Sequence, residues 1–306
     1  MAAEGGNIIW FTYTGVDGEV IDEEATHISV QAGVVRARTF RLHRNIVEVN
    51  CHEKVEKIEQ YAFTCCRSLR RVIMRGVKIV EEGAFDWCKA LEDVQCDKLE
   101  TIRQEAFNWC VSLKNINLPS ARIVHKSALW ECHGLTNVKF GNKLESIEEC
   151  AFENCESLEQ ITIPLKDGFI RGDDTFRGCH NLHRVHLVEG ELHETIAALH
   201  LEEWRNDMNK EIDLINLILP NAAAGWWDDE YGVEEPGEKA QTIRRWIRSV
   251  LLKITRYQAE HHRLLNEAES TLELILPNND ILVNNILPFL NLPPYTFELG
   301  NDEDDI

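Results

Sequence analysis

Six cysteines recur at nearly even spacing along the chain, and they are the first residues whose type and spacing could do chemistry. They are Cys66, Cys88, Cys110, Cys132, Cys155 and Cys179. Neighbours in this series lie 22 to 24 residues apart, whereas zinc sites need thiolates in close pairs such as C-x2-C. Disulfides between neighbours are geometrically conceivable, because adjacent strands lie about 4.8 Å apart, within the Cα separation that a bridge needs. We expect the thiols to stay reduced.

Three histidines, His180, His183 and His186, form the second group that could bind a ligand, with His193 nearby. A metal patch is one interpretation, and scattered surface histidines are the one we favour. The segment HETIAALH (193–200) does not match H-E-x-x-H, because its two histidines are seven residues apart. The sequence also lacks G-x-G-x-x-G, a Walker loop and a nucleophile elbow. It therefore predicts no enzyme, with no catalytic residues, no bound metal and no cofactor.

The cysteines belong to a repeated unit, I-x3-A-F-x2-C-x2-L-x2-I/V-x-I/L, and this repeat explains their spacing. Its phenylalanine position is filled by seven anchor residues: Phe40, Phe63, Phe85, Phe107, Leu129, Phe152 and Phe176. The steps between anchors are 22 to 24 residues, a period typical of a leucine-rich-repeat solenoid. One rung cannot bury its own apolar face, so stacked rungs must share a continuous core.

Each part of the unit has an expected place in the rung. L-x-x-I-x-L predicts a strand of a parallel sheet, and A-F-x-x-C predicts a short turn or helical segment on the opposite side. The anchor, the leucine and the following Ile or Val point inward, and each contributes about 1.5–3 kcal/mol on full burial. Because a buried free cysteine behaves as a small hydrophobe, we interpret the cysteine series as packing.

The A-F-x-x-C-x-x-L signature over about residues 36–190 resembles that of the BspA-like leucine-rich-repeat family. The resemblance is closest to the large families of such proteins in diatom-type microalgae, in which a helical segment often follows the solenoid. It implies an α/β fold: a right-handed solenoid of stacked parallel strands, followed by an α-helical hairpin. It also implies an interaction scaffold with no established activity. Leu129 in place of Phe, and His43 in place of the first cysteine, depart from the pattern.

The chain divides into four expected parts. Residues 1–35 form an N-terminal strand cap, in which Trp10, Phe11 and Tyr13 cover the first coil. Residues 36–190 form a seven-rung solenoid, and residues 191–276 form a helical hairpin with an acidic loop at 220–237. Residues 277–306 form an acidic tail with a short amphipathic segment.

Two apolar stripes at helical spacing predict the hairpin. The first comprises Leu201, Trp204, Met208, Ile212, Ile215 and Leu219, and Pro220 ends it. The second has a heptad pattern made by Ala240, Ile243, Ile247, Val250, Ile254, Tyr257, His261, Leu264 and Ala268. We favour an intramolecular hairpin, and self-association through a coiled coil is the alternative. In the loop, acidic residues beside Trp226 and Trp227 are either solvated or dock a basic partner.

The tail gives an alternative function. Leu276-Pro277, Ile281, Ile286-Leu287 and Leu290 are similar to the opening of an F-box, the motif that docks onto a ubiquitin-ligase adaptor. On this interpretation residues 276–290 form a partial F-box, and the protein is a substrate receptor of the ligase. The simpler interpretation is a small amphipathic segment that packs on the hairpin.

Charge and composition exclude several classes of partner. The formal net charge is −20, so the chain should repel nucleic acid and anionic membranes. We find no secretory signal at the start and no run of 18 apolar residues. Ten cysteines without a signal indicate reduced thiols, and therefore a cytoplasmic location, with the nucleus as the alternative.

Outward positions of the predicted strands give the candidate binding face. One column of these positions comprises Arg71, Asp93, Asn115, Asn137, Gln160 and Arg184. The column is polar, mixed in sign and rich in amides, which suits hydrogen-bonded recognition of a protein or an extended polypeptide. A merely solvated sheet face needs the same residues. We predict a protein–protein interaction scaffold that binds its partner on this face.

Overall fold

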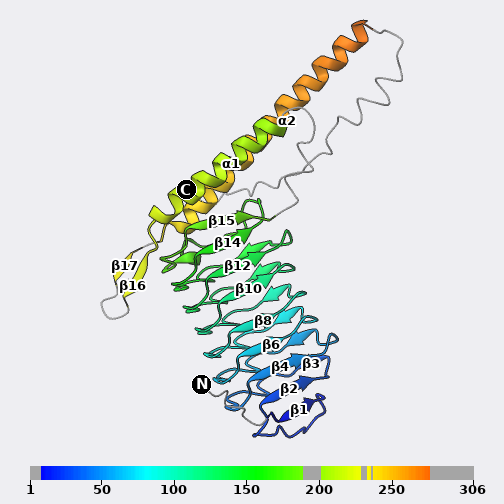
Figure 1. The fold of residues 1–306 in the computed structure, drawn as a ribbon, viewed down its shortest axis with the longest axis vertical. Helices are drawn as coiled ribbons and strands as arrows, with labels where there is room; N and C mark the ends of the chain where they lie inside the picture. Colours follow the sequence, from blue (N-terminus) through cyan, green and yellow to red (C-terminus); the bar gives the residue numbers. More distant parts are fainter. Residues whose placement is uncertain (1–7, 189–200, 229–232, 236, 276–306) are drawn as a thin grey trace, which may run out of the picture.

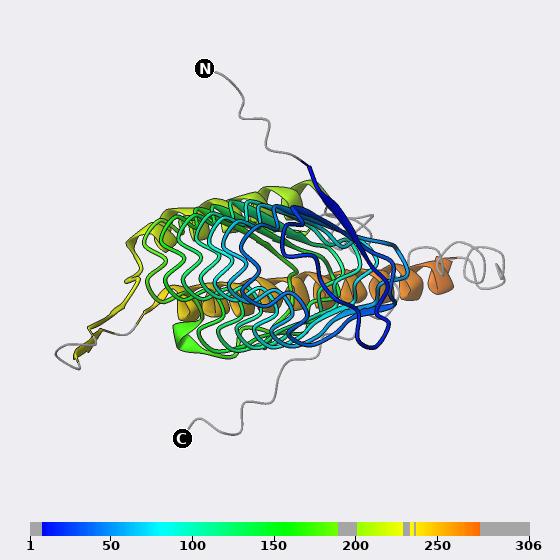
Figure 2. The ribbon, with the colours of Figure 1, turned by 90° about the horizontal axis from the view of Figure 1, so that it is seen from below.

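The protein is a parallel β-solenoid followed by two helices (Figure 1). A computed structural model describes residues 8–188, 201–228, 233–235 and 237–275 of the 306-residue chain. The fold class expected from the repeat is confirmed, including the two helices after it. Viewed along the stack from its N-terminal end, successive rungs superpose and the helices lie behind them (Figure 2).

One side of the solenoid is formed by the longer strands, which pair in parallel. The first five, in spatial order, are β1 (Trp10–Tyr13), β2 (His27–Val30), β4 (Glu48–Cys51), β6 (Arg71–Ile73) and β8 (Asp93–Gln95). The remaining four are β10 (Asn115–Leu118), β12 (Asn137–Phe140), β14 (Gln160–Ile163) and β15 (Arg184–Leu187). We call the outward side of these nine strands the long-strand face.

A second parallel sheet, which the repeat unit did not predict, forms another side of the solenoid. It consists of the two-residue strands β3 (Val34–Val35), β5 (Lys57–Ile58), β7 (Ile79–Val80), β9 (Thr101–Ile102), β11 (Ile123–Val124) and β13 (Ser146–Ile147). Ile170 extends this sheet by a bridge to Ile147. A strand of two residues is too short to show an alternating pattern, so only stacking with its neighbours reveals it.

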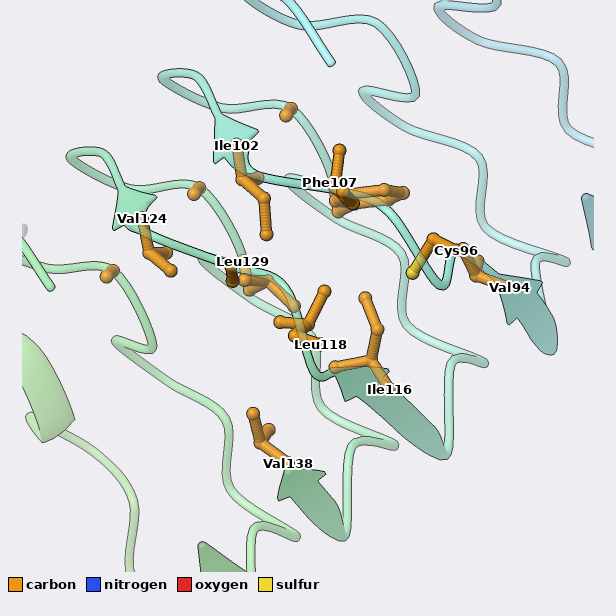
Figure 3. Packing of buried hydrophobic residues seen from close by; sticks show 14 of the residues in the cluster. Val94, Cys96, Ile102, Phe107, Ile116, Leu118, Val124, Leu129 and Val138 are labelled. Atoms are coloured by element: carbon orange, nitrogen blue, oxygen red, sulfur yellow. The ribbon is translucent and has the colours of Figure 1, made fainter. Parts of the chain in front are cut away.

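Each rung therefore runs from a long strand to a short strand and then to the anchor turn. Neighbouring rungs pair strand to strand, as β2 does with β4 and β3 with β5. One such rung belongs to each of the seven anchors. Interior side chains come from all three parts, as Figure 3 shows for Ile102 and Val124 on one side, Ile116 and Val138 on the other, and Phe107 between them. These side chains are 0–2 % exposed, so one core runs through the stack.

The anchor phenylalanines stack on one another along this core. The ring centroids of Phe40 and Phe63 lie 5.0 Å apart, those of Phe63 and Phe85 5.2 Å, and those of Phe85 and Phe107 5.2 Å, with the rings nearly parallel. Phe152 and Phe176 continue the stack at 5.7 Å. Such aromatic pairs contribute about 0.5–1.5 kcal/mol beyond their buried area.

Leu129 interrupts this stack, and a large aromatic residue of the next rung packs beside the interruption. Phe140, at the end of β12, lies edge-on to Phe152 with centroids 6.2 Å apart. The equivalent position holds Leu118 in the preceding rung and Ile163 in the following one. The larger side chain has therefore moved from the anchor to the strand, which keeps the interior filled.

The six cysteines of the repeat are fully buried and donate hydrogen bonds between rungs. Cys110 Sγ lies 3.3 Å from the carbonyl oxygen of Phe85, and Cys132 Sγ lies 3.2 Å from that of Phe107. The other four thiols make the same bond, at 3.0–3.2 Å, to the anchor of the preceding rung. Burial raises the pKa of the Cys110 thiol well above its usual value. A thiol held protonated and inaccessible is a packing group.

The N-terminal end is closed by Tyr13, one of the three aromatic residues expected there. Its ring is 3 % exposed and meets the ring of Phe40 edge-on, with centroids 5.4 Å apart. Phe11 packs partly against the core, whereas Trp10 is 52 % exposed and lies beside His27 on the long-strand face. Tyr13 therefore continues the phenylalanine stack.

The C-terminal end is covered by the antiparallel helices α1 (Leu201–Ile218) and α2 (Lys239–Ile275) (Figure 1). Pro220 lies in a short 3-10 turn directly after α1. The connection expected as a loop contains a two-stranded antiparallel ladder, β16 (Trp226–Asp228) with β17 (Val233–Glu235). The acidic residues of this segment did not indicate strands, because Asp and Glu have low strand propensity.

Side chains of both helices satisfy the open end of the last rung. Asn216 Oδ1 of α1 accepts a hydrogen bond from Val185 N on β15, at 2.9 Å. Lys239 Nζ donates to the carbonyl oxygens of Leu182 and Leu219, at 2.7 and 3.2 Å. The heptad stripe is buried from Ala240 to Ile254 in the same core as the solenoid. That part of α2 is thus an intramolecular cap.

No helix in the described part of the chain is long and apolar enough to cross a membrane. The predicted F-box-like segment at 276–290 and the acidic tail at 277–306 lie outside the described residues. The side chains of Trp226 and Trp227 also lie outside them, so the docking interpretation of the acidic loop stays a prediction.

Candidate partner-binding face

The six residues predicted for partner binding each open a long strand and lie in register with their neighbours. Arg71 pairs with Asp93 across β6 and β8. Asn115, Asn137, Gln160 and Arg184 form one row across β10 to β15. In β10 and β12, the first and third side chains reach solvent while the second and fourth are buried. This alternation follows from the two-residue period of a strand.

The row is divided in two by a break in the sheet between β8 and β10. Strands β1 to β8 pair as one sheet and strands β10 to β15 as another, and no backbone hydrogen bond connects β8 to β10 within residues 8–188. A hollow of about 710 Å³ lies over this break. Its polar lining includes Arg75, Asp93, Gln95, Asn115, Asn117, Asn137 and Lys139. The predicted residues Asp93, Asn115 and Asn137 thus meet at one depression.

On the N-terminal side of the break the polar side chains bind one another. Arg71 Nε lies 3.0 Å from Asp93 Oδ2. Gln95 donates to Asp93 at 3.2 Å and accepts from Arg75 at 2.9 Å. Arg75 also lies 3.9 Å from Asp97. These groups already have partners, so a ligand would have to compete for them.

On the C-terminal side of the break several polar side chains have no partner. Asn117, Asn137, Lys139, Thr162 and Arg184 make no side-chain hydrogen bond or ion pair with the described residues. Asn115 only accepts a bond of 3.3 Å from Thr136. Free amides and cations at fixed spacing can bind the backbone and side chains of an added segment.

His186 lies near two of the cations on this half of the face. Its Nε2 lies 3.2 Å from Gln160 Oε1, an amide oxygen that accepts the hydrogen bond. Its pKa lies below the usual histidine value, first because of burial and then because of the nearby charges of Arg184 and Lys139. No group of three or more His, Cys, Asp or Glu in the described ranges is arranged to hold a metal ion, so the alternative of a metal patch at His180, His183 and His186 has no support there.

Sequence reasoning missed an aromatic pair on the opposite side of the rungs. Trp87 and Trp109 stack with centroids 5.1 Å apart, and Lys89 Nζ lies 4.2 and 4.9 Å from the two rings. Both tryptophans have a positive φ, at 57° and 55°, where Gly178 fills the same position in the last rung. The signal was available in the consecutive stretches DWC and NWC. The pair already has its cation and shows no sign of a further ligand.

The family described as "BspA type Leucine rich repeat region" matches the chain in six copies, over residues 24–124 and 100–198. Among curated proteins none matches this sequence.

Three solved structures are similar to parts of the chain. A leucine rich cell surface protein from Faecalibacterium prausnitzii is 25% identical, with a TM-score of 0.44, over 60% of this chain and 49% of that one. A leucine rich repeat protein from T. pallidum is 24% identical, with a TM-score of 0.38, over 59% of this chain and 70% of that one. A leucine-rich repeat protein from Bacteroides ovatus is 19% identical, with a TM-score of 0.40, over 55% of this chain and 53% of that one. The chain spans about half the length of the Faecalibacterium protein.

Proposed function

Since this chain belongs to the BspA-type leucine-rich-repeat family, we propose that it is a non-enzymatic scaffold that binds a protein on its long-strand face. The observation that carries the proposal is the row of outward polar residues in register from Asn115 to Arg184, with several side chains unpaired among the described residues. Solenoids offer such surfaces because stacked rungs form an extended regular sheet.

We also propose that the chain is related to the microalgal families in which a helical segment follows the repeats, and that it is located in the cytoplasm or the nucleus. All ten cysteines are free, and nine of them are buried. Reduced thiols in this number are typical of intracellular proteins. The F-box alternative depends on residues 276–290, which lie outside the described residues.

Affinity capture from the source cell tests the binding face. The baits are the full chain, the variant with Arg71→Ala, Asn115→Ala and Asn137→Ala, and a control with Arg122→Ala and Gln104→Ala on another side of the rungs. We expect the first variant to lose partners that the control keeps, with both variants unfolding at the temperature of the parent. Equal capture by all three baits would exclude this face.

We also propose self-association through the helical hairpin as a second candidate function. Leu214 and Leu217 on α1, and Leu252 on α2, expose 45%, 68% and 56% of their surfaces. Covering exposed apolar side chains such as these with a second copy would stabilise a dimer. Light scattering of the full chain and of the variant Leu214→Glu with Leu217→Glu measures this. A monomeric full chain at the highest soluble concentration would remove the proposal.

A further inference from the structure

We infer that the C-terminal half of the long-strand face, from β10 to β15, binds an acidic segment of a partner protein in extended conformation. Lys139 and Arg184 would each meet a carboxylate, and the amides between them would bind the segment's backbone. This inference rests on the proposed function, because it names the chemistry of the partner at the same face.

The charge of the two halves differs in sign, although the whole chain is strongly acidic. The outward positions considered are the residue before each strand and its first and third residues. Over β10, β12, β14 and β15 they hold three cations, Lys114, Lys139 and Arg184, and one acid, Glu159. Over β4, β6 and β8 they hold two cations and three acids, namely Arg70, Arg71, Glu48, Glu92 and Asp93. A local cationic surface on a chain of net charge −20 favours an acidic ligand of limited size.

The cations on this half are free to pair with a ligand. Lys114, Lys139 and Arg184 are exposed and have no ion-pair partner among the described residues. In the other half, Arg71 is paired with Asp93. An arriving carboxylate therefore gains a charge contact at Lys139 or Arg184 without breaking an existing one.

The register fixes the separation of the two cations. Lys139 lies in register with Thr162 and His186, and Arg184 lies two residues before His186 on the same strand. Two strand spacings and two residue steps place the two Cα atoms about 12 Å apart. An extended chain advances about 3.3 Å per residue. Because alternate side chains of an extended segment point the same way, carboxylates four residues apart would reach both cations.

The amides supply the reason for an extended conformation. Asn117 and Asn137 line the hollow over the sheet break, and their side-chain amides have no hydrogen-bond partner in the described chain. A carboxamide both donates and accepts, so each can bind a peptide N–H and a peptide C=O. A helical segment uses its own backbone groups internally and could not make these bonds.

Selection from a random 12-residue peptide display library on the full chain is the test. We expect enriched peptides to carry two Asp or Glu residues four positions apart. Their affinity should fall about three- to tenfold in the variant with Lys139→Gln and Arg184→Gln, and should weaken with added salt. The matched control, Lys78→Gln with Arg122→Gln, removes the same charge elsewhere and should bind like the parent.

The other outcomes separate this inference from the proposed function. If enriched peptides are neutral or basic and lose affinity with Asn115→Ala and Asn137→Ala, the face binds polypeptides, but the inference of an acidic partner segment is wrong. Acidic peptides that bind the Lys139 and Arg184 variant normally also overturn the inference. If no peptide is enriched, or none responds to a change on the face, both proposals fail.

Discussion

Interior positions of the strands repeat similar residues from rung to rung, whereas outward positions of the same strands vary. Inside, the repeat places the same groups in most rungs: an anchor ring stacked at about 5 Å and a thiol bonded to the previous anchor. Outside, strand β12 presents Asn137 and Lys139 where β8 presents Asp93 and Gln95. Interior groups contact the same group one rung away, so they must match, whereas outward groups contact solvent or a ligand and can differ.

The largest expected effect comes from breaking the interior. Phe107→Ala removes a fully buried ring that stacks on Phe85, and it should lower the free energy of unfolding by about 3–5 kcal/mol. Asn115→Ala, on the outward face of the next strand, should change it by less than about 0.5 kcal/mol. Urea denaturation of both variants measures the difference. A loss below about 1 kcal/mol for Phe107→Ala would contradict the picture of a tightly shared core.

A smaller effect tests whether interior positions compensate for one another. Leu129→Phe restores the repeat signature but adds volume to a core in which Phe140 of the next rung already packs edge-on to Phe152. It should cost about 1–3 kcal/mol of stability. The double variant with Phe140→Leu should recover most of this loss, because the large ring returns to the anchor position. If the single variant were more stable than the parent, the space beside Leu129 would be empty.

The buried thiols predict how stability depends on alkaline pH. Burial raises the pKa of Cys96 from 9.0 to about 12 in the folded protein. Below pH 9 the thiol is protonated in both states and its contribution is complete. As pH rises from about 9 to 12, only the unfolded chain loses the proton, so stability falls, by up to about 1.4 kcal/mol per pH unit for one thiol.

Cys96→Ala should therefore show a shallower loss of stability between pH 9 and pH 11 than the parent, in urea titrations. The control is Leu118→Ala, which creates a cavity at the equivalent position of the next rung without removing a titrating group. It should lower stability at every pH and keep the slope of the parent. Equal slopes for all three proteins would mean that the Cys96 thiol is accessible to solvent.

The prediction with the smallest expected effect concerns the two halves of the long-strand face. A double-mutant cycle on Arg71 and Asp93, which are paired at 3.0 Å and about half exposed, should give a coupling of about 0.2–1 kcal/mol. A cycle on Asn137 and Lys139, which have no bond to each other, should give none within error. Equal coupling free energies in the two halves would contradict the difference in side-chain pairing from which we infer an acidic partner segment.

Much of the fold was predictable because the repeat constrains the same positions many times. The anchors Phe85 and Phe107 and the buried Cys110 followed from the spacing alone, and the stripe on α2 predicted its buried side as far as Ile254. The short strands were missed, since two residues carry no pattern. The strand ladder at Trp226–Asp228 was missed because its acidic neighbours indicated a loop.

For the candidate site, the sequence predicted which residues point outward but not which of them are free. Arg71 and Arg184 hold the same position in the repeat, yet only Arg71 faces an acid in the next rung. The break between β8 and β10 leaves no trace in the local sequence, because it depends on how one rung sits on another.

The sequence by itself determined the solenoid, its seven rungs and the packing role of its cysteines. These features depend on periodicity, and a period is a property of the chain. Only the tertiary structure decided where the sheet divides, how Phe140 packs against Phe152, and which cations on the described part of the long-strand face remain unpaired. Those features depend on contacts between residues that are far apart in the sequence, and such contacts exist only once the rungs have stacked.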